Sequence, residues 1–173
     1  MNLRLVLLTM SATALYLSTG FAHSATTEES AMSNPAQACQ LSIPAPDSKA
    51  KPKATGFVNG GTSPVYVICG FINPSTMSGG VERFTIGARS LTGQDVPITC
   101  TGVIGTIGDP SPWYVTKTLT ARANGDSSPS WYPSDFGGTL TIPSSGSFSV
   151  TCALPPSVLI SYTEALYLYE IGS

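Results

Sequence analysis

Two near-duplicate segments carry the residues with the clearest capacity for binding chemistry. The first is Ser111-Pro112-Trp113-Tyr114 and the second is Pro129-Ser130-Trp131-Tyr132-Pro133, with Asp135 close behind. An exposed aromatic ring can stack on the C–H face of a sugar, and a nearby carboxylate can accept hydrogen bonds from its hydroxyls. The candidate binding residues are therefore Trp113, Tyr114, Trp131, Tyr132 and Asp135.

The same aromatic residues also fit a purely structural role. Tryptophan and tyrosine are highly buried on average, so rings at loop–strand junctions can cover the open ends of a sheet instead of a ligand. The solvent exposure of Trp113 and Trp131 separates the two interpretations. Two buried indoles would exclude sugar stacking at these segments.

The chain lacks the residue sets on which most catalysis depends. Its single histidine, His23, lies in an N-terminal segment that we expect to be removed, which leaves no Ser-His-Asp or Cys-His nucleophile and no histidine metal site. Asp126 and Asp135 supply too few oxygens for calcium. We expect no cofactor, no metal and no enzyme activity. A carboxylate-based hydrolase stays a third alternative, because such an enzyme needs only two acids.

The first 24 residues have the features of a secretory signal peptide. Arg4 precedes the apolar run Leu5–Leu17, and Ala22-His23-Ser24 has small residues at the positions that a signal peptidase site requires. The run is shorter than the roughly 20 residues of a membrane span. We expect cleavage near Ser24, a secreted or periplasmic location, and no membrane span after cleavage.

The remaining chain divides into a polar leader and one domain. Residues 25–37 show no apolar periodicity and predict a disordered leader, followed by a domain over 38–173. Seven basic and ten acidic residues remain after residue 24, a formal charge of −3. This weakly acidic balance argues against nucleic acid as a partner. The candidate partners are a glycan or an extracellular protein, and the oligomeric state stays open.

Four cysteines in an exported chain predict two disulfides. Four cysteines can pair in three ways, and the sequence alone does not select one. We prefer Cys39–Cys69 and Cys100–Cys152, because strands that are neighbours in sequence are usually neighbours in space.

Short runs with a period of two predict an all-β fold. In residues 147–154, Phe148, Val150, Cys152 and Leu154 alternate with small or hydroxyl residues, so one face is buried and the other meets water. Similar runs separated by Gly, Pro, Ser and Asn predict a single antiparallel β-sandwich or jelly-roll-like domain of about eight strands. The expected strands cover 55–59, 65–71, 82–90, 96–104, 113–123, 139–142, 147–154 and 158–171, the last with a turn near Thr163.

One further pattern resembles a known group of proteins. The string Cys152-Ala153-Leu154-Pro155-Pro156, followed by Ile160-Ser161-Tyr162, is similar to the C-terminal end of a group of uncharacterised small bacterial secreted proteins. Cys39 and Val67-Ile68-Cys69 fit the same outline, although Gly70 stands where such proteins often have proline. The resemblance implies an exported β-sandwich and transfers no active site. Our leading hypothesis is a non-enzymatic structural or binding module, and the alternative is a carbohydrate-binding module that uses the loop aromatics.

Overall fold

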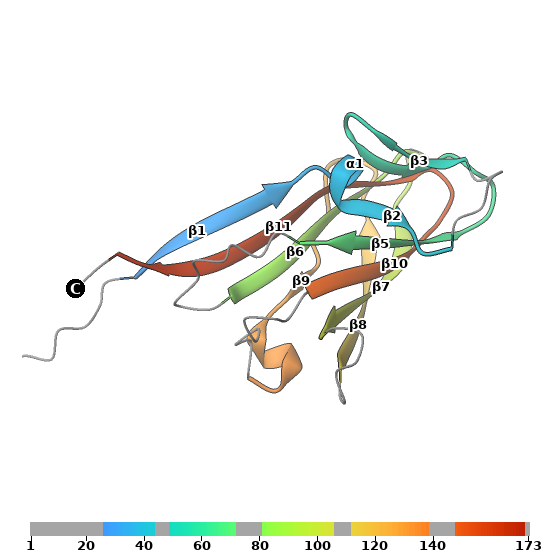
Figure 1. The fold of residues 1–173 in the computed structure, drawn as a ribbon. Coiled ribbons are helices and arrows are strands. Elements are labelled where there is room, and N and C mark those ends of the chain that lie inside the picture. Colours follow the sequence, from blue (N-terminus) through green and yellow to red (C-terminus); the bar gives the residue numbers. More distant parts are fainter. Residues whose placement is uncertain (1–25, 44–48, 72–80, 106–111, 139–147, 172–173) are drawn as a thin grey trace, which may run out of the picture.

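The structure is a computed structural model that describes residues 26–43, 49–71, 81–105, 112–138 and 148–171. In these residues the strands form two antiparallel sheets that pack as a sandwich (Figure 1). The all-β sandwich predicted from the alternating runs is confirmed. The expected strand 139–142 and the proposed signal peptide lie outside the described residues.

The first sheet has six strands in the order β3-β4-β11-β6-β9, and β1 pairs with β11 beside this path. These strands are β1 (Thr26–Ser33), β3 (Ala50–Lys53), β4 (Gly56–Asn59), β6 (Val81–Ser90), β9 (Ser130–Trp131) and β11 (Val158–Glu170). Figure 1 shows β1 and the end of β11 as a long ribbon that extends past the other strands.

The second sheet has five strands in the order β2-β5-β10-β7-β8. These strands are β2 (Cys39–Leu41), β5 (Val65–Gly70), β7 (Val96–Ile104), β8 (Trp113–Ala121) and β10 (Phe148–Leu154). Two short helices complete the described chain: α1 (Pro35–Ala38) precedes β2, and the 3₁₀ helix η1 (Pro133–Phe136) follows β9.

The core lies between the sheets and is built from the alternating positions of the strands. In β10, Phe148, Val150, Cys152 and Leu154 are buried, while the residues between them are half-buried. Phe148 stacks on Phe84 of β6 with ring centroids 3.8 Å apart, which joins the two sheets. The period-two pattern therefore places one face of each strand inside, as the sequence predicts.

Both predicted disulfides are present, and both lie within the five-stranded sheet. Cys39–Cys69 joins β2 to β5, and Cys100–Cys152 joins β7 to β10. In each bridge the two cysteines are directly opposite each other in the strand register. The preferred pairing is confirmed, but the bridged strands are neighbours in the sheet and not in the sequence: β3 and β4 lie between β2 and β5, and β8 and β9 lie between β7 and β10.

Three segments differ from the sequence-based expectation. Within the segment 25–37, expected as a disordered leader, Thr26–Ser33 form β1, which pairs with the far end of β11 over eight residue pairs, and α1 begins at Pro35. Residues 50–53, which lie outside all of the expected strands, form the edge strand β3. The expected turn near Thr163 is absent, because Thr163 is buried in a continuous strand; its register shifts against β6 lie on either side, between Ile160 and Tyr162 and between Leu166 and Tyr167.

The last strand, β11, pairs with strands of its own domain. β11 pairs with β1, β4 and β6, so both of its sides are occupied along much of its length. No helix in the described part of the chain is long and apolar enough to cross a membrane.

Candidate functional site

The two near-duplicate Trp-Tyr segments have opposite environments. Trp113 begins β8, the edge strand of its sheet, and its side chain is 53% exposed. Trp131 lies on β9, where Phe84 of β6 pairs with it, and it is 0% exposed. Only one of the two indoles can therefore meet a ligand from solvent.

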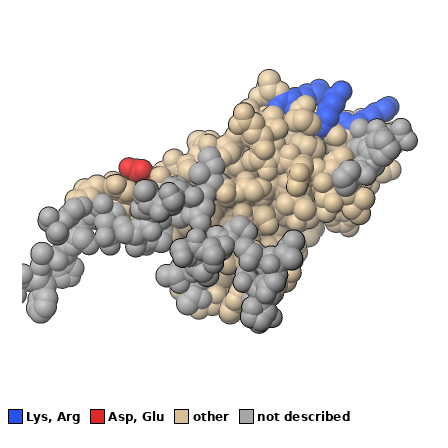
Figure 2. All heavy atoms as spheres, in the orientation of Figure 1, with Lys and Arg blue, Asp and Glu red and all other residues tan. Residues whose placement is uncertain are grey.

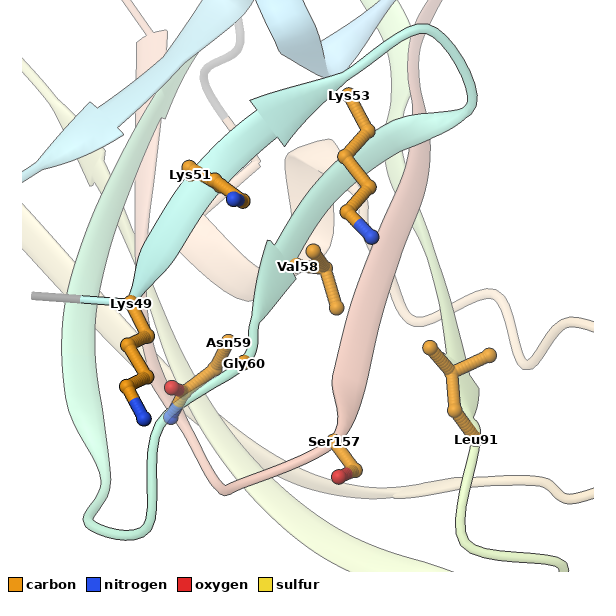
Figure 3. Close-up of a pocket in the computed structure, with 8 residues that line it drawn as sticks. All are labelled: Lys49, Lys51, Lys53, Val58, Asn59, Gly60, Leu91 and Ser157. Carbon is orange, nitrogen blue, oxygen red and sulfur yellow. The ribbon is translucent and has the colours of Figure 1, made fainter.

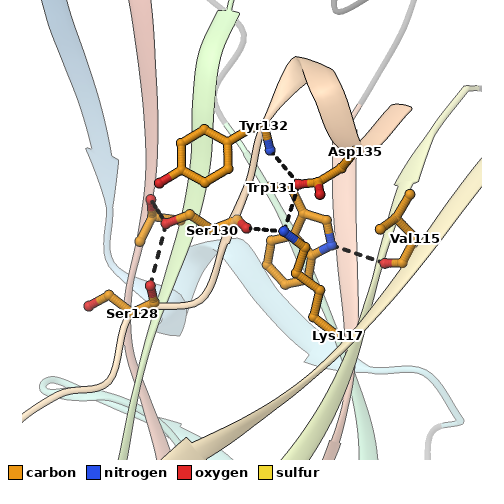
Figure 4. Close-up of polar contacts among 8 residues, drawn as sticks. Val115, Lys117, Ser128, Ser130, Trp131, Tyr132 and Asp135 are labelled. Atoms are coloured by element: carbon orange, nitrogen blue, oxygen red, sulfur yellow. Dashed lines mark hydrogen bonds and ion pairs between the residues drawn. The ribbon is translucent and has the colours of Figure 1, made fainter. Parts of the chain in front are cut away.

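Trp131 is held by packing and by one hydrogen bond. Its indole N–H donates to the carbonyl oxygen of Val115 at 3.0 Å (Figure 4). Its ring lies over Gly102 of β7, where a Cβ atom would come within 2.8 Å of the indole Cδ1 and Nε1. Gly102 thus provides the space that the ring occupies. A ring enclosed in this way links the two sheets and has no free face for stacking.

Lys117 and Asp135 form a polar cluster beside this ring. The Lys117 ammonium donates to the Asp135 carboxylate at 2.6 Å and to the Ser130 carbonyl oxygen at 2.7 Å (Figure 4). Asp135 also accepts from the backbone N–H of Tyr132 at 2.8 Å, which fixes the start of η1. These contacts explain why a lysine interrupts the apolar side of β8: it joins that strand to the β9–η1 segment.

The electrostatics of this cluster favour the charged carboxylate. Burial alone would raise the pKa of Asp135, but the hydrogen bonds from Lys117 and from the Tyr132 N–H, with the charge of Lys117, bring its pKa below the ordinary value. A carboxylate that already accepts these donors is engaged within the protein. Its geometry is that of a residue positioning η1.

Three of the candidate aromatics do reach solvent. Tyr114 is 64% exposed and Tyr132 is 45% exposed, and Trp113 is the third exposed ring. Trp113 lies against Gly137 at the end of η1, where a Cβ would be 3.4 Å from its ring. Because successive residues of a strand point to opposite sides, Tyr114 lies on the outer face of the sheet and Trp113 on the η1 side. The sequence candidates therefore divide between two surfaces.

The outer face of the five-stranded sheet bears no charged side chain at its strand positions. We call this surface the neutral face. It consists of Gln40, Tyr66, Ile68, Gly70, Pro97, Thr99, Thr101, Val103, Tyr114, Thr116, Thr118, Thr120, Ser149, Thr151 and Ala153. The partners of these positions on the other side of each strand form the core, so this face is directed to solvent.

Hydroxyl groups run across the neutral face in rows set by the strand register. Thr116, Thr101 and Thr151 lie opposite one another on β8, β7 and β10. The hydroxyls of Thr101 and Thr116 are 2.8 Å apart and share a hydrogen bond. Such a row provides both donors and acceptors without any net charge.

Tyr66 completes this face and was missed in the sequence. It is 60% exposed on β5, in the same row as Ala153, Thr99 and Thr118. The register places Tyr66 three strands and four residues away from Tyr114, a separation of about 20 Å from ordinary strand spacings. The available signal was an aromatic at an outward position of a strand that is otherwise apolar on both faces.

Three of the acidic side chains in the described residues form ion pairs. Arg83 pairs with Glu164 at 3.6 Å and Arg89 pairs with Asp126 at 2.9 Å, as Lys117 does with Asp135. No group of three or more metal-ligating side chains occurs within the described ranges. Each of these three carboxylates is accounted for by a cation partner.

The chain matches no protein-family model and no curated protein sequence. Three solved structures are similar to it in fold. The xylan-binding module CBM15 has a TM-score of 0.47 and 9% identity, covering 82% of this chain and 97% of that one. TmCBM61 in complex with β-1,4-galactotriose has a TM-score of 0.38, 9% identity and coverages of 82% and 88%. The family 11 carbohydrate-binding module from Clostridium thermocellum, in complex with a β-1,3-1,4-mixed-linked tetrasaccharide, has a TM-score of 0.36, 10% identity and coverages of 90% and 92%.

Proposed function

We propose that this protein is an exported, non-catalytic carbohydrate-binding module whose ligand is a neutral polysaccharide. The observation that carries the proposal is the neutral face: an exposed sheet surface with rows of hydroxyls and a tyrosine toward each of two opposite corners. Tyr114 and Tyr66 supply rings that can stack on sugar C–H faces. The threonine rows supply the hydrogen bonds that sugar hydroxyls require.

The shape of the ligand follows from the position of the two tyrosines. They lie about 20 Å apart on a diagonal across β8, β7, β10 and β5, with hydroxyls between them. A single sugar could contact only one ring, whereas an extended chain can reach both. The absence of charge at the described positions of this face makes a neutral chain a better fit than an acidic one.

The residues proposed from the sequence have different roles in this proposal. Tyr114 belongs to the binding face, whereas Trp113 and Tyr132 lie at the adjoining η1 edge and can extend it. Trp131 and Asp135 support β8 and η1 from within. The exported location rests on the signal-peptide features and on the two disulfides, which persist in oxidising compartments.

The test is binding of the purified protein to xylan, β-1,4-galactan and mixed-linked β-glucan by affinity electrophoresis and calorimetry. We expect one of these polymers to bind, and we expect Tyr114→Ala and Tyr66→Ala each to weaken that binding by about 5- to 10-fold, or roughly 1 kcal/mol. Met32→Ala is the matched control, because Met32 is 59% exposed on β1 of the other sheet. Unchanged affinity in both tyrosine variants, or no binding to any neutral polysaccharide, would contradict the proposal.

A further inference from the structure

A second surface of the molecule has the opposite chemistry to the neutral face. Beside β3 and β4 lies a groove of about 510 Å³. We call it the lysine groove. Among the residues that line it are Lys49, Lys51, Lys53, Val58, Leu91 and Ser157 (Figure 3). It belongs to the six-stranded sheet and shares no residue with the neutral face.

The three lysines lie on one side of the chain at β3: Lys51 and Lys53 belong to the strand, and Lys49 directly precedes it. Ala50, between the first two, is buried, and all three lysines are exposed. Alternate residues of a strand are spaced by about 7 Å, so the three side chains form a row about 13 Å long. Figure 2 shows basic side chains gathered at the β3 end of the molecule.

These lysines, like Arg122, form no ion pair with a carboxylate in the described part of the chain. The three ion pairs among the described residues use Arg83, Arg89 and Lys117. No acidic residue lines the groove in the described part of the chain. Three like charges along one short stretch of chain, at and directly before β3, favour binding of an anionic ligand.

Ser157 adds an independent observation at the same groove. It has φ 58° and is the only non-glycine residue with a positive φ within the described ranges. It occupies the third position of the turn from Pro155 to Val158, closed by a hydrogen bond of 3.3 Å, where glycine is favoured. Ser157, in a backbone conformation that favours glycine, brings a hydroxyl to the lining of the same groove as the lysines (Figure 3).

We propose that the lysine groove binds an acidic polysaccharide chain, with the three lysines contacting successive anionic groups and Ser157 donating a hydrogen bond to the chain. An extended row of ammonium groups matches a repeating polyanion better than one compact ion. Lysine and proline on an edge strand also discourage pairing with another sheet, but that role requires neither a groove nor the strained serine. The choice of a saccharide as the anion rests on the proposed function.

The experiment measures binding of polygalacturonate to the purified protein by calorimetry at low and at high salt. We expect binding that weakens with salt and that falls about tenfold in K49Q/K51Q/K53Q, the combined effect of three exposed ion pairs. The charge-retaining K49R/K51R/K53R should stay within about threefold of the original protein. Ser157→Gly, which suits the turn and removes the hydroxymethyl side chain, should weaken binding by about two- to threefold.

Controls separate this site from general charge and from the neutral face. Arg122→Gln removes an exposed cation outside the groove and should leave polygalacturonate binding unchanged. Poly-L-glutamate and inorganic phosphate should bind at least tenfold more weakly; equal binding of either would overturn the polysaccharide assignment. The proposal also fails if polygalacturonate does not bind or if the glutamine variant binds it equally well. Because neutral-polymer binding is measured on the same variants, failure at the neutral face is distinguished from failure at the groove.

Discussion

The close contact between Gly102 and Trp131 leads to a prediction that a double-mutant cycle can measure. A Cβ at residue 102 would come within 2.8 Å of the indole Cδ1 and Nε1, closer than real Cβ atoms approach other atoms. Trp131 is fully buried and Gly102 lies on the interior strand β7, so neither has room to move freely. We expect Gly102→Ala to lower the free energy of unfolding by about 1–3 kcal/mol, the usual cost of overpacking.

The partner variant, Trp131→Phe, tests the other side of the contact. It removes the indole N–H that donates to the Val115 carbonyl, and it removes part of a buried ring. The unpaired carbonyl and the small cavity together should cost about 2–3 kcal/mol. Because phenylalanine lacks the Nε1 atom that opposes residue 102, Gly102→Ala should cost about 1 kcal/mol less in the Trp131→Phe background than in the original protein.

The assay is urea unfolding at neutral pH with the disulfides intact, followed by far-ultraviolet circular dichroism because one variant removes a tryptophan. Each 1 kcal/mol should also lower the Tm by about 2–4 °C for a domain of this size. Sites that do not touch have effects that add to within about 0.3–0.5 kcal/mol. Strict additivity of the two substitutions, or a neutral Gly102→Ala, would refute the packing described for this ring. Polysaccharide binding should be retained by both folded variants, since Trp131 has no exposed face.

Three further predictions concern other parts of the same scaffold. Asp135→Asn should lower the unfolding free energy by about 1 kcal/mol at pH 7 through loss of the Lys117 contact. Because the pKa of Asp135 is lowered in the folded protein, this difference in unfolding free energy is complete above about pH 5 and shrinks as the pH falls below about 4. Urea titrations at several pH values would detect the change. Replacing both Cys100 and Cys152 with serine should cost roughly 4 kcal/mol, because the bridge closes a separation of 52 residues; a loss below about 1 kcal/mol would contradict this. In Trp113→Phe, the remaining tryptophan should emit at short wavelength and resist acrylamide, and strong quenching would show that it is exposed.

Local alternation predicted the central strands well. The expected run 96–104 is β7 without change, and 147–154 differs from β10 by one residue, because each places apolar residues on every second position against one core. The polar segment containing Glu28 and Glu29 shows no such pattern, yet it becomes β1. Its backbone pairs with β11 through contacts about 140 residues apart in sequence, for instance between Tyr167 and Glu29, which no local window contains.

The two Trp-Tyr segments show where prediction of the site reached its limit. Their sequences are nearly the same, but Trp131 is followed by the turn of η1 and paired with β6, while Trp113 starts an edge strand. The difference in exposure arises from partners distant in sequence. The role of Asp135 likewise depends on Lys117, which is 18 residues away in sequence and lies on β8 of the five-stranded sheet. Residue type could indicate binding chemistry, but only tertiary packing decides which rings remain accessible.

The two disulfides lie in only one of the two sheets, which leads us to expect a difference in rigidity between the two proposed binding surfaces. Both bridges lie in the sheet that carries the neutral face, and together they hold four of its five strands in two fixed pairs. A binding surface that is rigid before the ligand arrives loses less conformational entropy on binding. The lysine groove lies on the sheet without bridges, at a short edge strand whose long side chains can adjust to a ligand. Reduction of the disulfides should therefore weaken binding of a neutral polysaccharide more than binding of an acidic one, for as long as the six-stranded sheet stays folded.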